Sequence, residues 1–180
     1  MAKIMKGRYA AQTDEPFVVF IIGMRINKFL EFKKWLSVAR AMGPMIEVLN
    51  KNPQKGYLGG QSFLYWPGVA LVQYWRSFED LENFARSPQE PHLSAWKAFH
   101  KKISGDGSVG IWHETYMVQP GQSEAIYDNM PIFGLADATK HVKAVGGKHT
   151  ARRRLGGDNE PPVEIVDGYE ETEKGKDGSV

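Results

Sequence analysis

The chain has 180 residues and a mass of 20.3 kDa, with 42% apolar residues, 24% charged residues and a formal net charge of +2. This is the composition of a globular domain with a core of its own. It excludes a membrane span, because no stretch approaches the roughly 18 consecutive apolar residues needed, and the absence of cysteine excludes disulfides and thiolate catalysis. We expect a cytoplasmic protein.

Charge is distributed unevenly along the chain. Residues 150–180 hold five Lys/Arg and eight Asp/Glu, which leaves 18 and 13 for residues 1–149. An excess of five basic residues is too small for a nucleic-acid footprint, so we expect no nucleic-acid partner. The acidic, Gly- and Pro-rich composition of residues 150–180 is typical of a flexible tail. Residues 1–16 read as a polar lead-in, and the folded domain is predicted to span residues 17–149.

Hydrophobic periodicity predicts the elements of this domain in chain order. A central strand, Phe17 to Arg25, leads to an amphipathic helix that Asn27 caps and that Gly43-Pro44 kinks or restarts before Asn52. Next come a hairpin, 57–66 and 69–76 across Pro67-Gly68, and a helix that opens at Ser77 and ends at 87–88. The remaining predicted elements are a helix over 91–103, a strand over 110–119 and a short helix over 134–145.

The predicted order is β-α-β-β-α-α-β, which is the split β-α-β order of a ferredoxin-like α+β fold. Such a fold has a four-stranded antiparallel sheet with helices on one face. The other sheet face also carries large side chains, which would form an exposed apolar patch. A homodimer that packs sheet on sheet would cover this patch.

Several segments resemble a known family. The segment YWRSFEDLENFARSP, followed by His92, Trp96, Phe99 and His100, resembles the dimeric α+β barrel proteins of the antibiotic-biosynthesis monooxygenase-like group and its haem-degrading relatives. GIWHETY and IYDNMPIFGLADA resemble, more narrowly, the family typified by the fumagillin-pathway polyketide monooxygenase. The resemblance covers roughly residues 16–145. It implies a dimeric barrel fold, a ligand site between sheet and helices, and oxygenation of an organic substrate.

Two histidines are the candidate catalytic residues. His113 shares one strand face with Ile111, Thr115 and Met117, where it is the polar anomaly in an otherwise apolar set and could serve as a base or an iron ligand. The alternative is a buried histidine satisfied by a backbone carbonyl. His92 lies in the first turn of a helix, where the helix dipole favours its neutral ring, and shares a helical stripe with Trp96. That stripe is equally compatible with a core.

Aromatic and basic residues supply candidate substrate contacts. Tyr65 and Tyr74 on the hairpin could position a planar substrate, and Arg25 or Arg76 could hold an enolate or carboxylate. The alternative is that the aromatic residues form a core or a dimer interface.

These features favour a monooxygenase-like enzyme that acts on an aromatic or polyketide-like small molecule. His113 would act as base or ligand, with His92, Tyr65, Tyr74, Arg76, Arg25 and Trp96 around the substrate. The sequence carries no phosphate-binding glycine motif and no zinc motif, and it demands no cofactor. The two histidines leave haem binding open. The other alternative is a non-catalytic binder or carrier of a hydrophobic metabolite.

Overall fold

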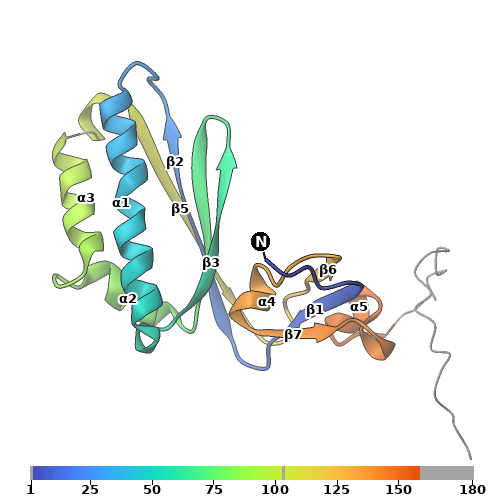
Figure 1. The fold of residues 1–180 in the computed structure, drawn as a ribbon. Coiled ribbons are helices and arrows are strands. Elements are labelled where there is room, and N and C mark those ends of the chain that lie inside the picture. Colours follow the sequence, from blue (N-terminus) through green and yellow to red (C-terminus); the bar gives the residue numbers. More distant parts are fainter. Residues whose placement is uncertain (1, 103, 159–180) are drawn as a thin grey trace, which may run out of the picture.

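A computed structural model of the chain describes residues 2–102 and 104–158. Figure 1 shows a large antiparallel sheet with a layer of helices on one side and a smaller sheet projecting from the other side at its lower end. No helix within the described ranges is both long and apolar enough to cross a membrane.

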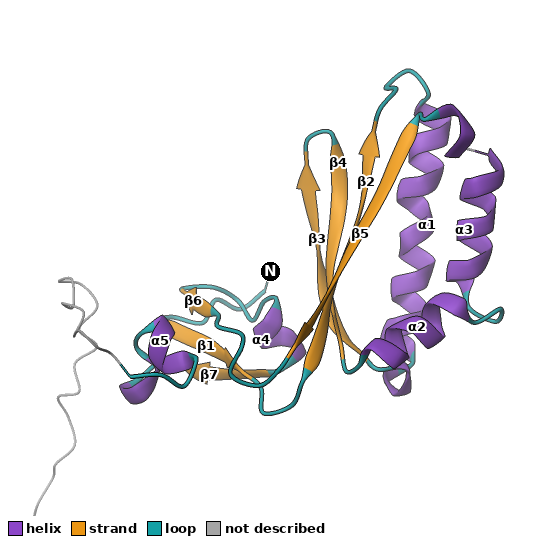
Figure 2. Cartoon of the chain, turned by 180° about the vertical axis from the view of Figure 1, so that it is seen from behind, coloured by secondary structure: helices purple, strands orange, loops and turns teal. Residues whose placement is uncertain are grey.

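The large sheet has the strand order β3-β4-β2-β5. Its members are β2 (Phe17–Ile26), β3 (Tyr57–Tyr65), β4 (Gly68–Trp75) and β5 (Val109–Val118). All neighbouring strands are antiparallel, and β2 lies in the middle, paired with β4 on one side and β5 on the other. The predicted ferredoxin-like α+β arrangement is therefore confirmed (Figure 2).

Three helices cover one face of this sheet: α1 (Phe32–Lys51), α2 (Phe78–Arg86) and α3 (Pro91–Lys102). Residue 103, which the sequence places at the end of α3, lies outside the described residues. Ser77 caps α2 as predicted, because its hydroxyl accepts a hydrogen bond from the Asp80 N–H at 3.1 Å.

Helix α1 differs from the prediction at two points. It begins at Phe32, because Asn27 does not cap it: the Asn27 amide instead donates to the Gly107 carbonyl at 3.1 Å and accepts from Arg25 at 2.7 Å. The helix also continues through Pro44 to Lys51. Gly43, which lacks a Cβ, avoids the usual clash between a proline ring and the preceding side chain.

The hairpin turn also differs from the prediction. Strand β3 ends at Tyr65 and β4 begins at Gly68, so the connection is Trp66-Pro67 rather than Pro67-Gly68. Gly68 is part of the ladder, where it pairs with Tyr65 and with Arg25 of the central strand. A Cβ at this glycine would lie 2.1 Å from the Met24 carbonyl oxygen, so only glycine fits this close approach.

The main core lies between the sheet and the helices. Its buried side chains are Val18, Met45, Leu49, Trp75, Leu81 and Phe84. Trp75 is fully buried, and its indole N–H donates to the side-chain oxygen of buried Gln73 at 3.0 Å. The one polar group of the largest core side chain is thereby satisfied.

A second sheet was not expected from the sequence. It has the order β6-β1-β7 and consists of β1 (Arg8–Gln12), β6 (Ile126–Asp128) and β7 (Lys140–Lys143). Residues 8–12 are thus a strand and not a lead-in. The helix predicted over 134–145 is only the short α4 (Leu135–Ala138), and β7 follows it. Strands of three to five residues are too short for their periodicity to be read.

This second unit packs on the lower part of the sheet face that the helices leave open. Phe133 lies edge-on to Phe63, with ring centroids 6.1 Å apart. Ala138 lies 3.7 Å from the position of a Cβ on Gly59. The chain therefore covers part of this face itself.

Four further short helices lie in the described chain: the 3-10 helices η1 (Pro53–Lys55), η2 (Ser104–Asp106) and η3 (Gly146–Lys148), and the final α5 (Ala151–Arg154). Helix α5 occupies the first residues of the predicted tail and is tied back by Arg154, which donates to the Lys148 and His149 carbonyls at 2.8 and 2.9 Å. Residues 159–180 of the predicted tail lie outside the described residues.

Candidate functional site

A cavity of about 340 Å³ lies between the helices and the sheet. This volume is within the range of small-molecule sites, roughly 300–1,000 Å³. Three helices and two strands line it. The sheet contributes Phe20 and Ile22 from β2 and Ile111, His113 and Thr115 from β5. The helices contribute Val38, Ala41, Met42 and Met45 from α1, Phe78, Leu81, Glu82, Ala85 and Arg86 from α2, and His92, Trp96 and Phe99 from α3. The lining is mostly apolar, and its candidate acid–base groups are the two imidazoles and the Glu82 carboxylate.

His92 has a defined tautomer in this cavity. Its Nδ1 lies 3.0 Å from the Ala85 carbonyl oxygen, in the last turn of α2. A carbonyl can only accept, so Nδ1 carries the hydrogen and donates it, and in the neutral ring Nε2 keeps its lone pair. The hydrogen bond thus satisfies a helix-end carbonyl and leaves one nitrogen for a ligand.

His113 lies opposite, on strand β5. Register pairs it with Ile22 of the central strand, and both side chains line the cavity. Its ring is tilted by 42° against Phe20, with centroids 5.7 Å apart. The residue is exposed, so it is not the fully buried structural histidine of the alternative interpretation.

Trp96 completes the aromatic wall. It is 41% exposed, lines the cavity and stacks on Phe99 with centroids 5.9 Å apart. The stripe predicted on α3 therefore does face the cavity, and the structure brings together His92, Trp96 and His113.

The sequence reasoning missed the polar rim of the cavity. Glu82 and Arg86 of α2 line it and form an ion pair of 3.0 Å across one helical turn. Thr115 of β5 adds a hydroxyl. The sequence already placed Thr115 on the same strand face as His113, and the spacing of four residues between Glu82 and Arg86 is the signal that could have indicated the ion pair.

The expectation that Tyr65 and Tyr74 line the same cavity as His113 is wrong for this chain. Both tyrosines lie on the opposite face of the sheet. The Tyr65 hydroxyl donates to the Met24 carbonyl at 2.9 Å and accepts from the Trp112 indole N–H at 3.0 Å. The Trp112 ring lies across Gly23, where an added Cβ would be 2.6 Å from the nearest ring atom. Tyr65 therefore fixes the indole on this face.

Tyr74 faces the second sheet. Its hydroxyl lies 3.6 Å from the position of a Cβ on Gly134, just before α4. Burial, with a smaller contribution from Tyr127, raises the pKa of Tyr74 above its ordinary value. Its hydroxyl therefore stays protonated at neutral pH, where it lies at the junction of the two sheets.

The two predicted arginines also lie away from the cavity. Arg76 follows β4 and forms two hydrogen bonds with Asp80, at 2.9 and 3.1 Å, which connect the strand end to α2. Arg25 is exposed near the end of β2 and donates to Asn27 at 2.7 Å. The prediction that Arg76 lines the cavity is wrong, because Arg76 lies beyond the end of β4 and its guanidinium is held by Asp80 and the Gln54 carbonyl.

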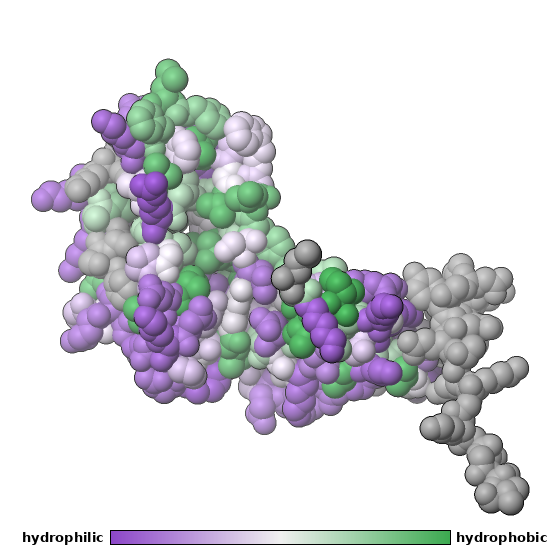
Figure 3. Space-filling view, viewed as in Figure 1, coloured by the Kyte–Doolittle hydropathy of each residue, from purple (hydrophilic) through white to green (hydrophobic). Residues whose placement is uncertain are grey.

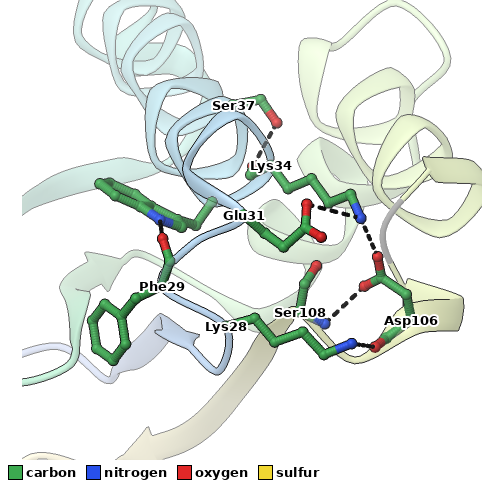
Figure 4. Close-up of polar contacts among 8 residues, drawn as sticks. Lys28, Phe29, Glu31, Lys34, Ser37, Asp106 and Ser108 are labelled. Carbon is green, nitrogen blue, oxygen red and sulfur yellow. Dashed lines mark hydrogen bonds and ion pairs between the residues drawn. The ribbon is translucent and has the colours of Figure 1, made fainter.

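Polar contacts connect the first turn of α1 to the segment just before β5 (Figure 4). Asp106, just before β5, accepts from Lys34 of α1 and from the Ser108 backbone N–H, the latter at 2.8 Å. The pKa of Asp106 lies well below its ordinary value of 3.8, mainly because the carboxylate accepts a hydrogen bond from Lys34. Lys28 donates to the Asp106 carbonyl at 3.0 Å. Strand β5, which carries His113, is thereby connected to helix α1.

No cluster of three or more His, Cys, Asp or Glu within residues 2–102 and 104–158 could hold a metal ion. Among the described residues, the two cavity imidazoles are the groups best suited to contact an iron-containing cofactor.

Comparison with known proteins identifies the family. The model of the family described as "Monooxygenase af470-like" matches residues 17–135, which include every strand of the large sheet and every helix that covers it. The chain belongs to this family. A curated relative, "Monooxygenase af470" of Aspergillus fumigatus, is 28% identical over 153 residues. The match covers 72% of this chain and 53% of the relative, so the chain spans about half the length of that protein.

Two solved structures are also similar to this chain. A crystal structure of aldoxime dehydratase superposes with a TM-score of 0.58 at 17% identity, over 72% of this chain and 42% of that chain. A dimeric protein with a ferredoxin-like fold from Bacteroides fragilis gives a TM-score of 0.42 at 17% identity, over 57% of this chain and 96% of that chain. The likeness to aldoxime dehydratase shows the fold alone and carries no conclusion about the reaction.

Proposed function

We propose that this member of the af470-like family is a monooxygenase that acts on an aromatic or polyketide-like small molecule bound between the helices and the sheet. The observation that carries the proposal is the mostly apolar cavity of about 340 Å³ with His113 and His92 on opposite walls. An apolar site with a few convergent polar groups suits a hydrophobic substrate with one reactive position. The family match supports the reaction type.

The residues suit oxygenation of an acidic carbon. In the proposed reaction, His113 removes a proton from a CH₂ group flanked by two carbonyls, which leaves a stabilised carbanion. The carbanion transfers electrons to dioxygen, and a C–O bond forms to give a hydroperoxide. Loss of water then converts the CH₂ into a carbonyl. One oxygen atom enters the product, the other leaves as water, and the substrate carbon supplies all the electrons.

The other cavity residues have supporting roles in this reaction. The Nε2 of His92 accepts a hydrogen bond from the enol form of the substrate, since its Nδ1 is already held by Ala85. Trp96 and Phe99 contact the flat face of the substrate and exclude water from the carbanion.

Oxygen consumption tests the proposal. Purified protein would be mixed with 1-phenyl-1,3-butanedione, whose central CH₂ is acidic, in an oxygen electrode. We expect one dioxygen consumed per tricarbonyl formed, and no consumption with the 2,2-dimethyl derivative, which has no proton to lose. Binding of the dione without oxygen uptake would support the alternative of a non-catalytic carrier. A shift of the Soret band on addition of haemin would instead support haem binding at His92.

A homodimer is part of the proposal. On the open face of the sheet Trp112 is 37% exposed, Phe63 41% and Tyr116 50%. Figure 3 shows further apolar side chains over the upper part of the sheet and its loops. The second sheet covers only part of the open face, so a second copy is expected to cover the rest. Light scattering should give the mass of two chains.

A further inference from the structure

A second cavity, of about 350 Å³, lies on the other flank of α1. Ala39, Gly43 and Ile46 of α1 form one wall, and Ser62, Val69 and Leu71 of β3 and β4 form the other. No titratable residue of the described chain lines this cavity. It can hold hydrocarbon, but it offers no group for acid–base chemistry.

The two cavities adjoin beneath α1. Ile22, Val38, Met42 and Ile111 line both of them. Met42 is unbranched and flexible, so its side chain can move aside more easily than a β-branched one. Beyond it, a Cβ on Gly43 would meet no atom within 4 Å, so the second cavity is open at this turn of the helix.

We infer that the two cavities form one elongated site, and that the substrate has a reactive aryl or dicarbonyl head and a long apolar tail. The head lies between His92 and His113, and the tail passes beneath α1 toward Ser62. The identity of the head rests on the proposed function, whereas the place of the tail rests on the shared cavity walls. Each cavity alone is near the lower limit for a small-molecule site, and together they suit a longer molecule.

A homologous series of 1-phenyl-1,3-diketones with growing n-alkyl chains tests the inference. Binding would be measured by isothermal titration calorimetry. Each methylene that enters the second cavity should tighten binding roughly fourfold. The gain should continue until this cavity is full and then stop.

Ser62→Phe fills the second cavity from the sheet side. Ser62 is exposed on a strand, where phenylalanine is well tolerated. The variant should bind the methyl member like the wild type and lose the gain with chain length. Gln61→Phe is the matched control, because the adjacent residue points to the opposite face and should keep the gain. Ala39→Leu narrows the same cavity from α1 and serves as a second variant.

The outcomes separate this inference from the proposed function. A chain-length gain that persists in both Ser62→Phe and Ala39→Leu would overturn the elongated site, as would a wild type that shows no gain. Thr115→Phe, which fills the first cavity, should weaken every member including the methyl one. A gain that Ser62→Phe abolishes, without oxygen uptake by any member, would overturn the proposed reaction and support the elongated site.

Discussion

Replacing His113 by alanine tests whether its imidazole is catalytic or structural. The residue is exposed on β5, and its main ring contact is Phe20, with centroids 5.7 Å apart. Such an aromatic contact contributes about 0.5–1.5 kcal/mol, and exposed positions otherwise tolerate substitution within about 0.5 kcal/mol. We therefore expect His113→Ala to lower the free energy of unfolding by about 1 kcal/mol, which corresponds to a fall in Tm of roughly 2–4 °C.

Activity should respond far more strongly than stability. Loss of a general base reduces turnover roughly 10²- to 10⁴-fold. The assay is oxygen uptake with 1-phenyl-1,3-butanedione, together with thermal unfolding followed by circular dichroism. Glu114→Ala is the control, because this neighbour on β5 points to the opposite face and should leave uptake unchanged.

Two outcomes would contradict a catalytic role for His113. If His113→Ala keeps its oxygen uptake, the imidazole is not the base. If its Tm falls far beyond the expected range and uptake falls only in proportion to the unfolded fraction, His113 has a structural role.

Three further predictions concern the framework of the site. Gly23→Ala places a Cβ within 2.6 Å of the Trp112 ring and should destabilise the fold by roughly 1–3 kcal/mol in urea unfolding; an unchanged midpoint would show that the ring moves freely. Gln73→Leu leaves the buried Trp75 N–H without an acceptor and should cost about 1–3 kcal/mol in the same assay, whereas a neutral result would mean that another acceptor replaces it. Asp106 has a depressed pKa, so the stability it contributes is complete above its ordinary value of 3.8 and is lost as the pH falls toward the depressed value. Asp106→Asn should therefore flatten the fall of Tm with pH below about pH 4, and identical profiles of variant and wild type would contradict this.

Local patterns in the sequence determined the architecture of the large sheet and its helices. The split β-α-β order follows from runs long enough to show a period: strands of eight to ten residues and helices of nine to twenty. The same periodicity grouped His92 with Trp96 on α3 and set His113 apart from Glu114 on β5. These groupings depend only on the geometry of one element, so one element's sequence suffices to predict them.

The tertiary structure alone decided what each group faces. Alternation shows that Tyr65 and Phe63 share a face, but only the packing of the helices shows that this face is not the one that carries His113. The second sheet pairs residues 8–12 with residues 126–128 and 140–143, contacts that join distant segments too short to show a period. The cavities likewise belong to no single element, because their volume is the space left between α1 and the strands beneath it, and that space depends on how side chains from several elements pack together.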